Sequence, residues 1–174
     1  HYRVAVATAR LGQPEVHLGI IPGAGGTQRL PRLCGPSLAL EMCTGGQPVT
    51  AAQAEQAGIV DAVIDGDLLE GAIAFAQARA AAREHRRTRD LQDRISDRAA
   101  GIAACQGVRA TVGKAARGAR APFAAVDAVE SCFTMDFDAG SRREIDMREA
   151  YLLLEEGASV SQIDNALTDF GYPV

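Results

Sequence analysis

Apolar and polar residues alternate with the period of a β-strand at the start of the chain. In residues 2–8, Val4 and Val6 fall on one face, because successive side chains of a strand point to opposite faces. A brief apolar run at residues 59–64 predicts a second strand. Helical patterns lie between and after these runs, and this alternation of strands with helices predicts an α/β fold.

Local signals mark where the helices begin and end. We expect two short helices, at residues 28–33 and 37–43, each followed by glycine. Thr50 with Gln53 forms a capping box, in which the side chains and backbone amides of the first turn satisfy one another. The helix that begins there ends near Gly58.

A longer, alanine-rich helix follows. Asp67 and Glu70 repeat the capping pattern at its start. Arginines then concentrate in residues 83–98, with acidic residues interleaved. The i,i+4 spacing of Asp90 and Arg94 favours an ion pair on a solvated helix face over a phosphate-binding patch.

Composition places the chain among ordinary globular proteins. Its 174 residues are 47% apolar and 23% charged, enough for one domain, or for one domain with a small appendage. A net charge of -4 does not favour nucleic acid or an anionic membrane surface as a partner. The four cysteines lack C-x-x-C spacing, which indicates a reduced, intracellular protein. No apolar run approaches the roughly 20 residues that span a bilayer, so no membrane insertion is expected.

One carboxylate stands just before a glycine-rich turn. Glu15 precedes the turn at residues 23–26, which opens a helix. Glycine permits close approach of a ligand to the backbone. The amides of the turn would either face a negative group or only form the hydrogen bonds of an ordinary turn. The arrangement suits acid/base chemistry beside a polar ligand. A dinucleotide fingerprint would need glycine at Gln28, and the chain has no P-loop ending, so neither nucleotide motif fits.

The run that contains this turn, residues 12–30, closely resembles the enoyl-CoA hydratase/isomerase (crotonase) family. Residues 38–46 and 51–61 resemble that family's next two segments, in the same order. The resemblance implies a crotonase-like spiral of β-β-α units, of which this chain would hold a part.

The resemblance also implies the site residues. Glu15 aligns with the family's second catalytic glutamate, and Pro22 and Gly23 would shape the substrate pocket beside it. The family's other glutamate and its oxyanion-hole amides lie upstream of the strand that here begins at His1. At His17 the family usually has an aliphatic residue, which favours a packed or half-exposed imidazole over a catalytic Glu-His pair. No metal ligands are expected, because the histidines lack ligand spacing.

The C-terminal third resembles two parts of the fused β-oxidation enzymes. Residues 120–130 and 137–144 resemble helices that close the hydratase half, whereas residues 147–158 resemble the helical C-terminal domain of 3-hydroxyacyl-CoA dehydrogenases. We therefore divide the chain into a partial hydratase domain, 1–145, and a helical dehydrogenase-like fragment, 146–174. No G-x-G-x-x-G is present, so no cofactor is expected here, and NAD only for the dehydrogenase part of a parent enzyme.

Together these resemblances imply part of a fatty-acid β-oxidation enzyme that adds water to trans-2-enoyl-CoA thioesters. The parent would also oxidise the 3-hydroxyacyl product with NAD. An enoyl-CoA isomerase, or a non-catalytic remnant that binds acyl-CoA or assembles through its C-terminal helices, remains open as an alternative. The implied location is the cytoplasm of a bacterium or the peroxisome of a eukaryote.

Overall fold

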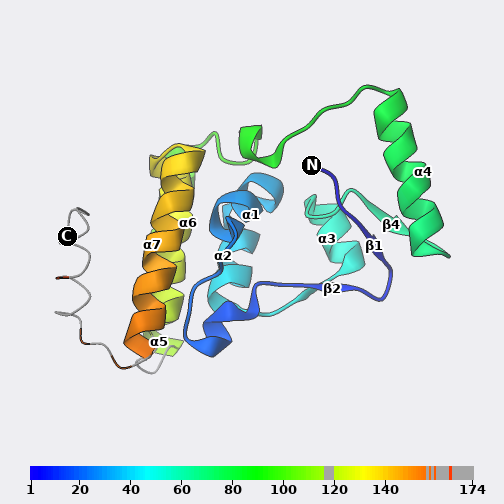
Figure 1. Ribbon diagram of the computed structural model, residues 1–174. Helices are drawn as coiled ribbons and strands as arrows, with labels where there is room; N and C mark the ends of the chain where they lie inside the picture. Colours follow the sequence, from blue (N-terminus) through cyan, green and yellow to red (C-terminus); the bar gives the residue numbers. More distant parts are fainter. Residues whose placement is uncertain (116–119, 156, 158, 160–164, 166–174) are drawn as a thin grey trace.

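The computed structural model describes residues 1–115, 120–155, 157, 159 and 165. Short strands and a protruding helix lie at one end of the molecule, and packed helices form the other end (Figure 1). In chain order the elements are β1 (Val4–Val6), β2 (Arg10–Leu11), η1 (Pro14–Leu18), α1 (Gly26–Cys34), α2 (Pro36–Gly45), β3 (Val49–Thr50), α3 (Ala51–Ala57), β4 (Ala62–Ile64), α4 (Leu68–Ala81), η2 (Thr88–Asp90), α5 (Arg98–Ala115), α6 (Ala121–Thr134) and α7 (Phe137–Glu155), where η marks a 3-10 helix.

The described strands form two small sheets. β1 pairs with β4 in parallel, with Val4 opposite Ala62, and β2 pairs with β3 antiparallel, with Arg10 opposite Thr50. The predicted second strand begins at Ala62 and not at residue 59. The residues before it close α3 instead, because the amides of residues 59 and 60 both donate to the Ala54 carbonyl. The predicted α/β alternation is confirmed, with short strands.

The helices predicted from local caps are confirmed. α1 and α2 contain the two short predicted helices. The Thr50 hydroxyl accepts from the Gln53 amide (3.2 Å), and the Gln53 side chain accepts from the Thr50 amide (2.9 Å), which completes the capping box of α3. Asp67 likewise accepts from the Glu70 amide at the start of α4 (2.9 Å).

The predicted solvated helix over residues 83–98 is wrong. Arg83 has φ +52°, a left-handed conformation that ends α4. The segment continues as irregular backbone with only the short η2. Asp90 pairs with Arg87 (2.5 Å) and not with Arg94.

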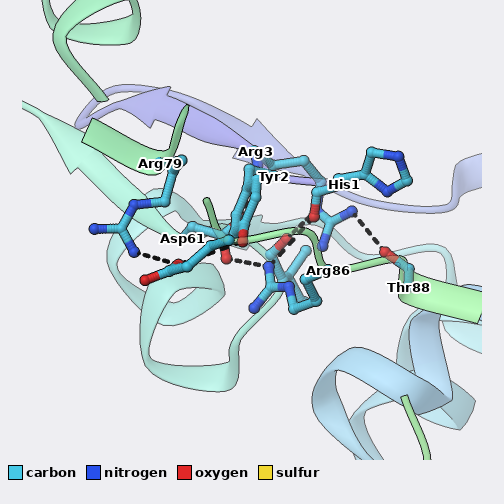
Figure 2. Close-up of polar contacts among 9 residues, drawn as sticks. His1, Tyr2, Arg3, Asp61, Arg79, Arg86 and Thr88 are labelled. Carbon is cyan, nitrogen blue, oxygen red and sulfur yellow. Dashed lines mark hydrogen bonds and ion pairs between the residues drawn. The ribbon is translucent and has the colours of Figure 1, made fainter. Parts of the chain in front are cut away.

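Partners distant in sequence hold this segment in its extended path. Arg86 pairs with Asp61, whose carboxylate also accepts from the Arg3 amide (2.7 Å) (Figure 2). The Arg3 guanidinium donates to Thr88 (3.4 Å), so the residue just before β1 is fastened to the segment at Thr88 as well as through Asp61. Sequence spacing could not reveal these contacts, because their partners are dozens of residues apart.

The core lies among the helices and not in the sheets. The largest buried apolar side chains include Leu40 of α2, Val129 of α6 and Ile21 from the loop before α1. α7 covers α6 and the start of α1. α4, in contrast, buries none of its residues and lies at the far end of the molecule from α7 (Figure 1).

The predicted division at residues 145 and 146 falls inside α7, which continues across it. Most of the predicted fragment 146–174 lies outside the described residues, so the division stays a prediction.

Candidate active site

A short 3-10 turn presents Glu15. Pro14 begins η1, and Gly19, with φ +79°, ends it by donating its amide to the Val16 carbonyl (3.2 Å). Glu15 is half-buried, yet its Oε2 atom is fully shielded from solvent and has no hydrogen-bond partner among the described residues. Burying a carboxylate oxygen without a partner is costly. Such an atom in a native fold calls for an explanation, and a catalytic role is one of those that apply.

His17 lies apart from this oxygen. η1 is helical and not extended, so the two side chains do not share a face as strand neighbours would. The imidazole is exposed and lies against Gly46, where an added Cβ would come 2.6 Å from Nε2. No hydrogen bond joins His17 to Glu15 in the described part of the chain, so the geometry does not favour a catalytic Glu-His pair.

The glycine-rich turn follows directly. Pro22 is fully buried, and the Gly26 amide donates to the Gly23 carbonyl (2.9 Å). The Arg148 side chain of α7 lies over Gly23, where a Cβ would meet its Cδ and Nε at 3.1 Å. Gly25 has φ +75° and caps α1, a conformation that favours glycine.

A carboxylate from α7 occupies the amides of this turn. Glu144, with 1% of its surface exposed, accepts from the amides of Gly25 (2.6 Å) and Thr27 (2.9 Å), and from the Thr27 hydroxyl (2.6 Å). The negative group that these amides face is therefore part of the protein. Sequence reasoning missed Glu144 because it lies 117 residues from Thr27, with no local signal that distinguishes it from other helical glutamates.

Two carboxylates approach one buried thiol in this region. Burial is the main cause that raises the pKa of the Cys43 thiol in α2, and the nearby Cys34, Glu15 and Glu144 raise it further. The Cys43 thiol therefore stays protonated at ordinary pH.

The glycine-rich turn does not fit a dinucleotide. A diphosphate would need the amides of Gly25 and Thr27, which the Glu144 carboxylate already takes.

Within the described residues, no group of three or more His, Cys, Asp or Glu side chains is placed to hold a metal ion. In the same residues, no helix has the length and apolarity to cross a membrane.

Residues 1–107 match the family described as Enoyl-CoA hydratase/isomerase. The chain belongs to this family. The hydratase/isomerase match includes Glu15, Pro22 and Gly23, and their roles stay predictions. The partial crotonase-like fold is confirmed, because a solved carnitinyl-CoA dehydratase from Mycobacterium thermoresistibile superposes over 99% of this chain and 56% of its own, with a TM-score of 0.52 at 22% identity.

Two curated relatives extend the comparison. A peroxisomal bifunctional enzyme from Danio rerio is 43% identical over 145 residues, covering 83% of this chain and 20% of its own. A 2,3-dehydroadipyl-CoA hydratase from Escherichia coli K12 is 55% identical over 74 residues, covering 42% of this chain and 29% of its own. The chain thus spans about a fifth to a third of the length of these relatives.

Proposed function

We propose that the protein is the hydratase portion of a fatty-acid β-oxidation enzyme and adds water to trans-2-enoyl-CoA thioesters. The observation that carries this proposal is the shielded, unpaired Oε2 of Glu15 before the glycine-rich turn. Family membership supports the reaction class. The name of the Escherichia coli relative, a 2,3-dehydroadipyl-CoA hydratase, supports hydration of a coenzyme A thioester.

Glu15 would act as a general acid or base. Hydration places the oxygen of water on C3 of the enoyl group and a proton on C2, and a carboxylate can move a proton in this step. A positioned carboxylate contributes roughly 10²–10⁴-fold to such a rate. Glu15 Oε2 makes no hydrogen bond within the described part of the protein, so a reacting water admitted beside it would be its hydrogen-bond partner.

The glycine-rich turn would shape the pocket without supplying an oxyanion hole. Its Gly25 and Thr27 amides already donate to Glu144, so they are not available to a thioester oxygen. Pro22 and Gly23 would instead define the wall beside Glu15, with Arg148 behind them.

Further parts of the proposal concern the parent enzyme. Oxidation of the 3-hydroxyacyl product with NAD rests on the resemblance of residues 147–158 to 3-hydroxyacyl-CoA dehydrogenases, and the name of the zebrafish relative calls that protein bifunctional. If the source is a eukaryote, the same name supports a peroxisomal location. If the source is a bacterium, we propose a cytoplasmic location. Assembly through the C-terminal helices stays a proposal that rests on the family resemblance.

The test compares Glu15→Gln with Glu41→Gln, which removes an exposed carboxylate from α2. We expect E15Q to slow hydration of crotonyl-CoA about 100-fold or more while E41Q leaves the rate unchanged. Calorimetric titration with the same thioester should show similar affinity for all three proteins. The proposal would be overturned if E15Q and the unsubstituted protein hydrated crotonyl-CoA at equal rates. It would also be overturned if the unsubstituted protein bound crotonyl-CoA without any turnover. Conversion of a 3-enoyl to a 2-enoyl thioester without hydration would replace it with the isomerase alternative.

A further inference from the structure

A cavity lies at the end of α1 that is remote from the glycine-rich turn. It encloses about 570 Å³ between α1, the segment that precedes α5, and the junction of α6 with α7. Its charged lining residues are Arg32, Arg89, Arg98, Asp90 and Asp136. Arg32 follows Gly26 by six residues, which is about 9 Å along the helix axis.

Arg32 is a buried cation without a carboxylate partner. Only 3% of its surface is exposed. Its Nη1 donates to the Gln28 carbonyl (2.6 Å) and lies 2.9 Å from Cys132 Sγ, whereas its buried Nε has no partner among the described residues. In these residues no acidic group pairs with it. A buried charge without an acidic partner is expensive to retain, and an anion bound in the cavity would offset this cost.

The aromatic wall of the cavity gathers further arginines. The guanidinium of Arg32 lies 5.1 Å from the centre of the Phe137 ring, and that of Arg89 lies 4.9 Å from it. Such cation–π contacts offset part of the cost of holding like charges together. Arg98 also lines the cavity and has no ion-pair partner within the described ranges.

The two carboxylates in the lining are already engaged. Asp90 pairs with Arg87 (2.5 Å), and Asp136 accepts from the Ala139 amide at the start of α7 (2.8 Å). Arg89 pairs with Asp138 (2.6 Å), outside the cavity lining. Asp136 keeps its negative charge in its contact with the Ala139 amide, and Arg32 and Arg98 are the lining cations that form no ion pair within the described residues.

We propose that this cavity binds an oxyanion, specifically a phosphate group, between Arg32 and Arg98. Guanidinium groups match phosphate oxygens in geometry and charge, and their N–H groups form strong charge-assisted hydrogen bonds. The phosphate belongs either to free inorganic phosphate or to coenzyme A. The free-phosphate form does not depend on the proposed hydratase function, so loss of enoyl-CoA turnover would leave it standing.

The test is calorimetric titration of the protein with inorganic phosphate and, separately, with coenzyme A, at ionic strength held constant with chloride. Arg98→Gln removes one proposed ligand. Arg94→Gln is the matched control, because Arg94 is an exposed arginine of the same segment that does not line the cavity. We expect R98Q to weaken binding about tenfold or more and R94Q to leave it unchanged. Arg32→Lys should weaken binding too, with its fold checked by circular dichroism.

The two titrations distinguish the source of the phosphate. If inorganic phosphate binds saturably and R98Q weakens this binding, the site takes the free anion. If R98Q weakens the binding of coenzyme A and inorganic phosphate does not bind, the phosphate group belongs to the coenzyme. Equal weakening by R94Q and R98Q would show a diffuse charge effect and overturn the proposal. The absence of saturable binding in both titrations would overturn it as well.

Discussion

Glu144 illustrates how one side chain can fix the start of a distant helix. Its carboxylate accepts three hydrogen bonds where the glycine-rich turn meets the start of α1, from the amide of Gly25 and from the amide and hydroxyl of Thr27. A negative charge at this position also interacts favourably with the positive end of the helix dipole. Because Pro22 and Gly23 belong to the same turn, Glu144 indirectly sets the wall beside Glu15.

Glu144→Gln should therefore destabilise the protein by about 2–3 kcal/mol. The amide group would turn an N–H donor toward donors of the turn and remove the charge. Urea denaturation followed by circular dichroism measures the effect. Glu149→Gln, at an exposed position of the same helix, should change stability little. Equal stabilities of the two variants would contradict the role given to Glu144.

The thiol of Cys132 supplies a pH-dependent prediction. Burial raises its pKa from 9.0 to about 11, although the nearby Arg32 acts in the opposite direction. Because the folded pKa lies above the unfolded one, this contribution to stability is complete below pH 9.0 and is lost as the pH rises toward about 11.

We expect the free energy of unfolding to fall across this alkaline window. Urea titrations at a series of pH values would show the slope, and Cys132→Ala should flatten part of it. The slope that remains in C132A would come from the other buried thiols with raised pKa values, Cys34 and Cys105, each with a pKa of about 12, and Cys43, whose pKa is raised as well. A C132A slope identical to that of the parent would contradict the assignment.

At the scale of elements, the sequence predicted what local chemistry determines. α3 and α4 begin where Thr50 and Asp67 accept amide hydrogen bonds from residues three positions later. Residues 83–98 were mispredicted because ion pairs to Asp61 and Asp138 decide their path. Glu15 could be found from its motif, whereas Glu144 and the arginine cavity depend on helix packing across most of the chain.

The packing of α5 on α6 provides a paired test. A Cβ on Gly101 would overlap the Phe133 ring of α6, whereas one on Gly107 of the same helix would meet nothing within 4 Å. Gly101→Ala should cost about 1–3 kcal/mol through overpacking. Gly107→Ala should gain about 0.5–1 kcal/mol, because alanine favours the helix. Thermal unfolding of both variants measures the contrast, and stabilisation by both would show that α5 does not pack on Phe133.

At the scale of the molecule, stability is unevenly distributed. The four helices α1, α2, α5 and α6 hold most of the buried apolar residues. β1 and β4 form a two-stranded sheet within the described residues, and such a sheet is marginal without further packing. α4 covers it without burying any of its own residues, and Leu69 is 70% exposed. The hydrogen bond and ion pair of Asp61 fasten the starts of β1 and β4 to the segment that follows α4.

Native-state hydrogen exchange should therefore reveal two levels of protection. Amides of α4, β1 and β4 should exchange through local opening, well before those of α2 and α6, since few buried contacts oppose their separation. Asp61→Asn should lower protection at β1 and β4 further, because it weakens the Arg86 pair that fastens the segment to β1. Glu41→Gln, at an exposed position of α2, should leave both levels unchanged. Equal protection of α4 and α6 would mean that the two ends unfold as one unit, and the Asp61 contacts would then add nothing to local stability.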